Sequence, residues 1–136
     1  PGMLERGRGA IVITGSVAGR QPLALHAVYA ATKAFDLLFG EALWSELRGL
    51  GIDVLVVEPG STQSEFHAIA GELPHAAEPA ASVVATALAA LGQQPSVISG
   101  WFNWLRAHLG QRLMPHSLIA LAAHRVTENY TPQEMR

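Results

Sequence analysis

Three side chains of the sequence have the types and the spacing that proton transfer requires. Ser16 comes thirteen residues before Tyr29, and Lys33 follows Tyr29 by four. On a helix, residues four apart share one face, so a helix here would bring Tyr29 and Lys33 together. A phenol ordinarily titrates near pH ~10, and a nearby cation favours its ionised form. Lys33 is therefore suited to make Tyr29 an acid and base near neutral pH.

Ser16 can hydrogen-bond the substrate oxygen that exchanges a proton with Tyr29. The three residues can therefore catalyse the proton transfer that interconverts an alcohol and a carbonyl group. The hydride of that reaction has to come from elsewhere, and a nicotinamide supplies it. Each residue alone has a simpler interpretation: a strand-end serine, a core tyrosine and a solvated lysine. The joint spacing favours the catalytic interpretation.

Three motifs, in order along the chain, carry a family resemblance. They are Ser16-Val17-Ala18-Gly19, Tyr29-Ala30-Ala31-Thr32-Lys33 and Pro59-Gly60-Ser61-Thr62. From about residue 9 to residue 66, the chain resembles the catalytic half of the short-chain dehydrogenase/reductases. The resemblance implies an NAD or NADP cofactor, with Tyr29 as general acid/base, Lys33 also binding the nicotinamide ribose, and Ser16 orienting the substrate oxygen. Thr14-Gly15 departs from the family, in which Ser or Asn is more usual at this place.

The turn after the second predicted strand is the expected nicotinamide end of the cofactor site. By the resemblance, Pro59 and Gly60 lie against the nicotinamide, while Thr62 and Ser64 contact its carboxamide and the phosphates. Ser64 stands where threonine is commoner in the family, and the hydroxyl is kept. The alternative interpretation is an ordinary strand-ending turn.

Two strands and one helix are predicted to position these residues. A strand is predicted over residues 10–15, because the short apolar run with β-branched side chains suits a parallel strand buried on both faces. A helix is predicted over residues 26–49, apolar on more than one face, and a second buried strand over residues 52–57. In open α/β sheets, ligands bind at the carboxyl ends of the strands, where Ser16 and Pro59 fall.

The whole pattern predicts an α/β fold, the C-terminal half of a Rossmann-like, doubly wound parallel sheet with about three strands and covering helices. Residues 61–79 are expected to form a functional loop, such as a lid. A helix is predicted over residues 79–91, a strand over 96–99, and two helices over 101–113 and 115–126. Residues 65–79 and the C-terminal helices are expected to shape the substrate pocket. Gly40, inside the long helix, predicts close packing there, because a helical glycine otherwise costs ~1 kcal/mol relative to alanine.

The composition indicates a globular protein and argues against several other classes. Of 136 residues, 49% are hydrophobic and 15% charged, and the net charge of −2 gives no sign of a nucleic-acid surface. There is no cysteine, and the six histidines lack a ligand-like spacing, so no metal site is expected. His26, beside the predicted site, is a candidate for substrate contact. No apolar run is long enough to span a membrane, and a cytoplasmic location is expected.

The chain is interpreted as a single partial domain, residues 1–136, of a longer enzyme. The glycine-rich dinucleotide loop that the family carries well before its catalytic serine is absent. The intact protein is expected to be an NAD(P)-dependent oxidoreductase of a small-molecule alcohol or carbonyl substrate, whereas residues 1–136 alone are expected to be inactive. The alternative is a non-catalytic dinucleotide-binding or scaffold protein of the same fold.

Two apolar surfaces point to contacts beyond a single domain. The second apolar face of helix 26–49 predicts a homodimer or homotetramer, as in the family. Trp101, Phe102 and Trp104 make an aromatic stripe on a helix that has no basic face. We therefore interpret the stripe as a pocket wall or a subunit contact rather than a membrane-surface helix.

Overall fold

The computed structural model describes residues 2–73 and 75–135. A three-stranded parallel sheet forms its centre, in the order β1-β2-β5, from β1 (Gly9–Thr14), β2 (Ile52–Glu58) and β5 (Ser96–Ile98). The register of β1 on β2 runs from Gly9↔Ile52 to Thr14↔Val57, and β5 pairs with the end of β2. The three predicted strands and the Rossmann-like α/β class are thus confirmed.

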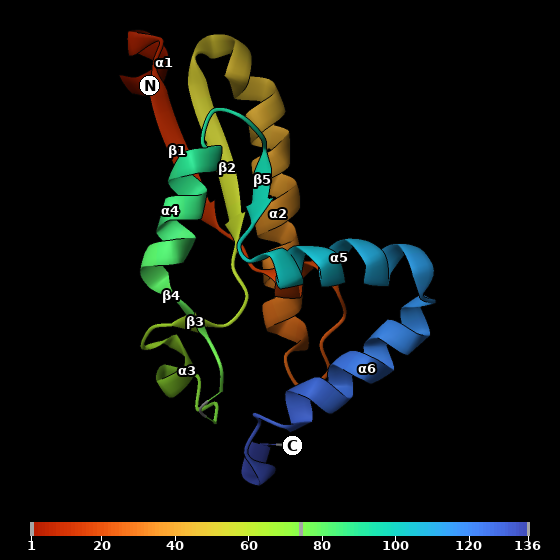
Figure 1. Cartoon of the computed structure of the whole chain (residues 1–136). Helices are drawn as coiled ribbons and strands as arrows, with labels where there is room; N and C mark the ends of the chain where they lie inside the picture. Colours follow the sequence, from red (N-terminus) through yellow and green to blue (C-terminus); the bar gives the residue numbers. More distant parts are fainter. Residues whose placement is uncertain (1, 74, 136) are drawn as a thin grey trace.

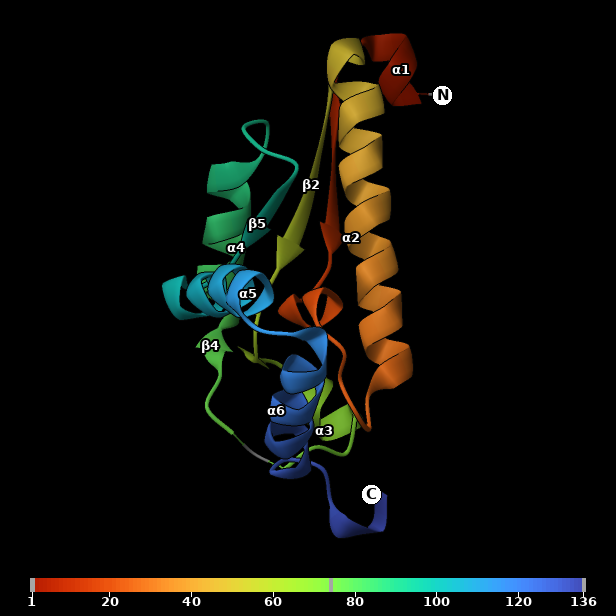
Figure 2. The same cartoon turned by 90° about the vertical axis from the view of Figure 1, so that its right-hand side faces the viewer.

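The long helix α2 (Ala27–Leu47) covers one face of the sheet (Figure 2). It follows the short 3-10 helix η1 (Val17–Arg20) and ends in another, η2 (Arg48–Leu50). Its buried residues are Ala30, Leu37 and Gly40. A Cβ on Gly40 would overlap the side chain of Val56, so the close packing predicted at this glycine is confirmed. The opposite face of the helix is exposed, with Leu38 68% accessible.

Helix α4 (Ala80–Ala90) covers the other face of the sheet, over β2 and β5. Its side chains Val83 and Ala87 pack against Leu55 and Val57. Because α4 does not reach β1, the burial of β1 alternates and Val12 is 45% exposed. The expectation of a strand buried on both faces is therefore wrong for β1 and right for β2.

The remaining elements gather at the carboxyl end of the sheet (Figure 1). The predicted loop contains β3 (Thr62–Gln63), α3 (Phe66–Ile69) and β4 (Glu78–Pro79), and β3 and β4 pair in parallel. Helix α5 (Trp101–Leu113) crosses the end of the sheet, and α6 (His116–Glu128) continues beyond it to η3 (Gln133–Met135).

Helix α1 (Gly2–Arg6) precedes β1 at the opposite end of the molecule. Among the described residues, no strand pairs with the outer edge of β1. In the same part of the chain, none of the helices has the length and apolar character needed to cross a membrane.

Candidate active site

The carboxyl ends of β1 and β2 open into a cavity of about 930 Å³. Ser16, Tyr29 and Lys33 all line it, although they come from the end of a strand and from the first turns of α2. The loop of residues 61–78 and the helices α4, α5 and α6 complete the walls. The structure therefore brings the three predicted catalytic residues to one concave surface at the place where α/β sheets bind ligands.

Ser16 is buried just after β1 and is tied to the turn that follows β2. Its Oγ accepts a hydrogen bond from the amide of Ala18 at 3.1 Å and donates to the carbonyl of Pro59 at 3.4 Å. The amide of Val17 donates to the same Pro59 carbonyl at 3.1 Å. Since 3.4 Å is long for a bond donated by a hydroxyl, the Ser16 proton is held weakly and can turn towards a substrate oxygen.

Lys33 is anchored where its cation can act on Tyr29. Its Nζ donates to the carbonyl of Thr14 at 2.7 Å and to a carboxylate oxygen of Asp36 at 3.1 Å. The same Nζ lies 6.0 Å from the centre of the Tyr29 ring. An ammonium has three donors, and these two bonds leave one for a ligand in the cavity. The sequence-based prediction missed Asp36, although its position three residues after Lys33 on a helix was a usable signal.

A second ion pair joins η1 to the end of β2. The guanidinium of Arg20 donates two hydrogen bonds to the Glu58 carboxylate, each 2.6 Å long, and Glu58 is fully buried. Hydrogen bonding to Glu58 raises the pKa of the Arg20 guanidinium above its ordinary value. The sequence-based prediction missed this pair too. The signal was a carboxylate directly after the apolar run of residues 54–57, because buried carboxylates are almost always paired.

The predicted cofactor residues Pro59, Gly60, Thr62 and Ser64 also line the cavity. The Thr62 hydroxyl donates to the Gly60 carbonyl at 3.1 Å, and the Ser64 hydroxyl donates to the Thr62 carbonyl at 3.4 Å. A Cβ on Gly60 would lie 2.6 Å from Nδ2 of Asn103 on α5, so this turn packs closely against that helix. Thus the turn lies on the cavity surface beside Ser16.

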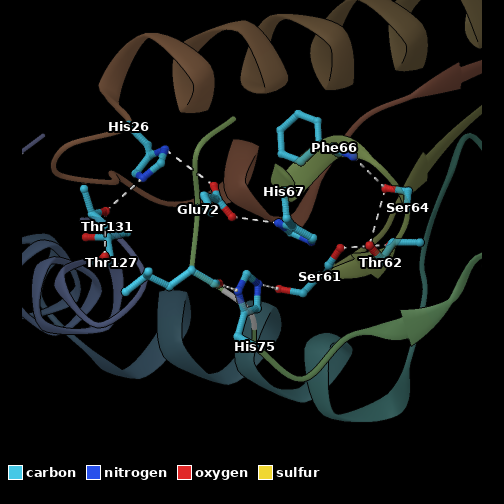
Figure 3. Close-up of polar contacts among 12 residues, drawn as sticks. His26, Ser61, Thr62, Ser64, Phe66, His67, Glu72, His75, Thr127 and Thr131 are labelled. Carbon is cyan, nitrogen blue, oxygen red and sulfur yellow. Dashed lines mark hydrogen bonds and ion pairs between the residues drawn. The ribbon is translucent and has the colours of Figure 1, made fainter. Parts of the chain in front are cut away.

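Three histidines meet around Glu72 on the loop wall of the cavity (Figure 3). His67 Nδ1 lies 2.7 Å from one Glu72 carboxylate oxygen, and His26 Nδ1 lies 3.9 Å from the other. The rings of His67 and His75 meet edge to face, 4.4 Å between centres. The sequence-based prediction, which treated the histidines as scattered, missed this cluster, although the placing of His67, Glu72 and His75 within nine residues was a usable signal. Only His26 joins them through the folding of the loop onto the start of α2.

The C-terminal segment holds this loop in place. The amide of Leu73 donates to the carbonyl of Tyr130 at 2.9 Å, and the His75 ring stacks on the Tyr130 ring at 4.8 Å. Burial raises the pKa of the Tyr130 hydroxyl. His26 Nε2, in turn, lies 3.3 Å from the Thr131 hydroxyl.

The apolar wall of the cavity comes from α4 and α6, with Met114 between α5 and α6. Its members include Val83, Ala87, Met114, Ile119, Ala123 and Val126. The aromatic stripe of α5 is not among the lining residues, and Trp101 is 77% exposed. Interpreting that stripe as a pocket wall is therefore wrong: α5 turns Asn103, Arg106 and Gly110 to the cavity instead. Its role as a subunit contact stays a prediction.

Comparison with known proteins assigns the family. The profile of the short chain dehydrogenase family matches residues 1–72, more than half of the chain. The chain belongs to this family. One relative, the NADP-dependent 3-hydroxy acid dehydrogenase YdfG of Salmonella typhi, is 48% identical over 60 residues, which is 44% of this chain and 24% of the relative. The chain spans about a quarter of the length of the curated relatives it matches.

Two solved structures extend the likeness to most of the chain. A structure of a 7beta-hydroxysteroid dehydrogenase superposes with a TM-score of 0.78 and 26% identity, covering 89% of this chain and 49% of that one. A short chain dehydrogenase from Burkholderia cenocepacia in complex with NADP superposes with a TM-score of 0.73 and 26% identity, covering 87% and 50%. The short-chain dehydrogenase fold therefore includes the loop and helices that follow residue 72.

The residues of this chain fit one end of a dinucleotide. The cavity offers an ammonium donor from Lys33, the Thr62 hydroxyl and the backbone of the Pro59-Gly60 turn, which suit a ribose and a carboxamide. The pyrophosphate of such cofactors is bound at a glycine-rich turn before a helix. No turn of that sequence is present in residues 1–136.

Proposed function

We propose that the intact protein is an NAD(P)-dependent oxidoreductase that interconverts an alcohol and a carbonyl compound. The observation that carries the proposal is the meeting of Ser16, Tyr29 and Lys33 on one cavity at the carboxyl end of the sheet. Family membership supports the reaction class. The NADP named for the 3-hydroxy acid dehydrogenase and for the Burkholderia cenocepacia complex supports the cofactor class.

Each of the three residues has its own task in this proposal. A nicotinamide, when bound, exchanges a hydride with the substrate carbon. Tyr29 gives a proton to the substrate oxygen during reduction and removes it during oxidation. The Lys33 cation, fixed by Thr14 and Asp36, stabilises the negative charge that Tyr29 carries between these events and donates to the nicotinamide ribose. Ser16 donates its weakly held proton to the substrate oxygen and so orients it.

Replacing Tyr29 by phenylalanine tests the proposal. The change removes the transferable proton and keeps the ring, so we expect turnover of the intact protein to fall by at least about 10²-fold with cofactor binding retained. Tyr130→Phe removes the only other phenol of the chain and should cost much less activity. The assay follows nicotinamide absorbance with NADH and NADPH against carbonyl compounds that include 3-oxo acids and oxosteroids.

The outcomes separate the proposal from its alternative. Unchanged turnover in Tyr29→Phe would show that another group transfers the proton. Cofactor binding without turnover of any substrate would favour a non-catalytic dinucleotide-binding or scaffold protein.

We also propose that the intact protein associates as a homodimer or homotetramer through the outer face of α2. Val28, Phe35 and Leu38 on this face are 82%, 64% and 68% exposed, and apolar patches of this kind mark interaction sites. Leu38→Glu should shift the mass measured by light scattering towards the monomer. Glu5→Gln, an exposed polar change on α1 and away from this face, is the control and should leave the mass unchanged. A monomeric parent protein at micromolar concentration would contradict the proposal.

A further inference from the structure

The histidine cluster on the loop wall contains a set of metal-ligating atoms that the proposed hydride transfer does not use. His67, Glu72 and His75 each offer one such atom, and the three atoms lie within 4.8 Å of one another. All three residues are partly buried and line the cavity (Figure 3). Two imidazoles and one carboxylate are the donor set of zinc sites that keep a coordination position open.

The hydrogen bonds of His75 orient its ring with Nε2 as the acceptor, and a metal ion binding there would displace the Ser61 hydroxyl. His75 Nδ1 lies 2.9 Å from the carbonyl of Leu73. A carbonyl oxygen only accepts, so Nδ1 carries a proton, and in the neutral ring Nε2 then carries the lone pair. The Ser61 hydroxyl donates to this Nε2 at 2.8 Å. Metal-binding histidines commonly donate their second ring N–H to a backbone carbonyl in this way, which sets the tautomer and the ring orientation.

The contact between His67 and Glu72 brings two further ligand atoms together. A proton between His67 Nδ1 and the Glu72 carboxylate, 2.7 Å apart, holds these two ligand atoms together. Metal ions bind the deprotonated forms of such ligands and release their protons. A bound ion would therefore replace the proton between His67 and Glu72. Glu72 has a side chain only 13% exposed, and its other oxygen faces His26 Nδ1 at 3.9 Å. His26 thus orients the carboxylate without being needed as a ligand.

We propose that His67, Glu72 and His75 bind one divalent transition-metal ion of the zinc class. Ligand distances of about 2.0–2.2 Å in a tetrahedral site place the ligand atoms about 3.4 Å apart. Rotation of the side chains on this short loop brings the atoms to that spacing. Because the ligands line the same cavity as Ser16 and Tyr29, the fourth position opens to it and can take water or an oxygen atom of a bound small molecule.

Titration of the protein with Zn²⁺ after chelator treatment tests the proposal by calorimetry. We expect one ion per chain, and we expect His75→Asn and Glu72→Gln each to weaken binding at least tenfold. His124→Asn is the matched control, because His124 pairs with Glu128 at 3.6 Å on the exposed side of α6, away from the His67, Glu72 and His75 group. This control should bind Zn²⁺ like the parent protein. Far-UV circular dichroism checks that each variant is folded.

Substitution of Co²⁺ in the unaltered protein gives a readout that needs no variant. A three-residue site with one open position should produce the intense visible absorption of four-coordinate Co²⁺. Weak absorption typical of octahedral Co²⁺, the absence of any Zn²⁺ binding, or loss of binding in His124→Asn but not in His75→Asn would each overturn the proposal. Neither the Zn²⁺ titration nor the Co²⁺ spectrum depends on oxidoreductase activity. Both can therefore fail or succeed independently of the test of the proposed function.

Discussion

Glu58 and Glu72 each pair with basic side chains beside the cavity, but their surroundings differ. Glu58 ends β2, is fully buried and receives two short hydrogen bonds from Arg20. Around it lies the carboxyl end of the sheet, formed by residues 14–20, 58–60 and 98–100. There the backbones of successive strands are hydrogen-bonded together. Glu72 lies in the loop of residues 61–78, which is not part of the three-stranded sheet, and its carboxylate contacts His67.

One wall of the cavity is fixed by the pairing of the strands, whereas the wall formed by the loop of residues 61–78 is adaptable. At the carboxyl end of the sheet, the Pro59 carbonyl accepts a hydrogen bond from the Val17 amide, and the Glu58 carbonyl accepts one from the Ser99 amide at 3.1 Å. These bonds are set by the strand pairing and hold Ser16 in place. In the loop, the Glu72 side chain contacts His67 and the His75 ring stacks on Tyr130, while backbone bonds link Glu72 to His67 and Leu73 to Tyr130 within the loop and the C-terminal segment. We therefore expect substitutions at the carboxyl end of the sheet to lower the stability more than matched substitutions in the loop of residues 61–78.

The largest difference is expected between the two glutamates. Glu58→Gln replaces the fully buried carboxylate that Arg20 binds with a neutral amide, which should lower the free energy of unfolding by about 3 kcal/mol. Glu72→Gln keeps an acceptor for His67 and should cost less than about 1 kcal/mol. Urea denaturation followed by circular dichroism measures both. Equal costs would mean that the two walls are equally rigid.

Alanine substitutions at two glycines are expected to change the stability in opposite directions. A Cβ on Gly19 would lie 2.6 Å from the backbone of Lys33, so Gly19→Ala forces η1 away from α2 and should cost about 1–3 kcal/mol. Gly110 lies inside α5, and a Cβ added to it would meet nothing within 4 Å, so Gly110→Ala should stabilise by about 0.5–1 kcal/mol. Thermal unfolding should move the midpoint down for the first variant and up for the second. A lowered midpoint in Gly110→Ala would contradict the open packing of α5.

The smallest difference is expected between two serines. The buried Ser99 hydroxyl lies 2.8 and 2.9 Å from the carboxylate oxygens of Glu78, and its removal in Ser99→Ala should cost about 1–2 kcal/mol. Ser61 is exposed, and Ser61→Ala should change the stability by less than about 0.5 kcal/mol. The same denaturation assay distinguishes them, and a larger loss in Ser61→Ala would mean that its hydrogen bond with His75 stabilises the fold more than the bonds of Ser99 do.

Local sequence patterns determined most of the elements. The helix predicted over residues 101–113 matches α5 throughout, and those predicted over 26–49 and 79–91 match α2 and α4 to within a few residues. Apolar periodicity and the glycines and prolines that end it are local signals, so they survive without knowledge of the fold. The same signals predicted that Ser16 and Pro59 lie at the carboxyl ends of neighbouring strands.

Only the tertiary structure decided which faces are covered and which distant side chains meet. Arg20 and Glu58 are 38 residues apart in sequence, and the two residues become neighbours only when β1 and β2 pair. The exposed face of β1 reflects the position of α4 over β2 and β5. His26 approaches Glu72 because the loop folds back on the start of α2. Long-range contacts of this kind depend on the packing of whole elements, which the spacing of residues along the chain does not encode.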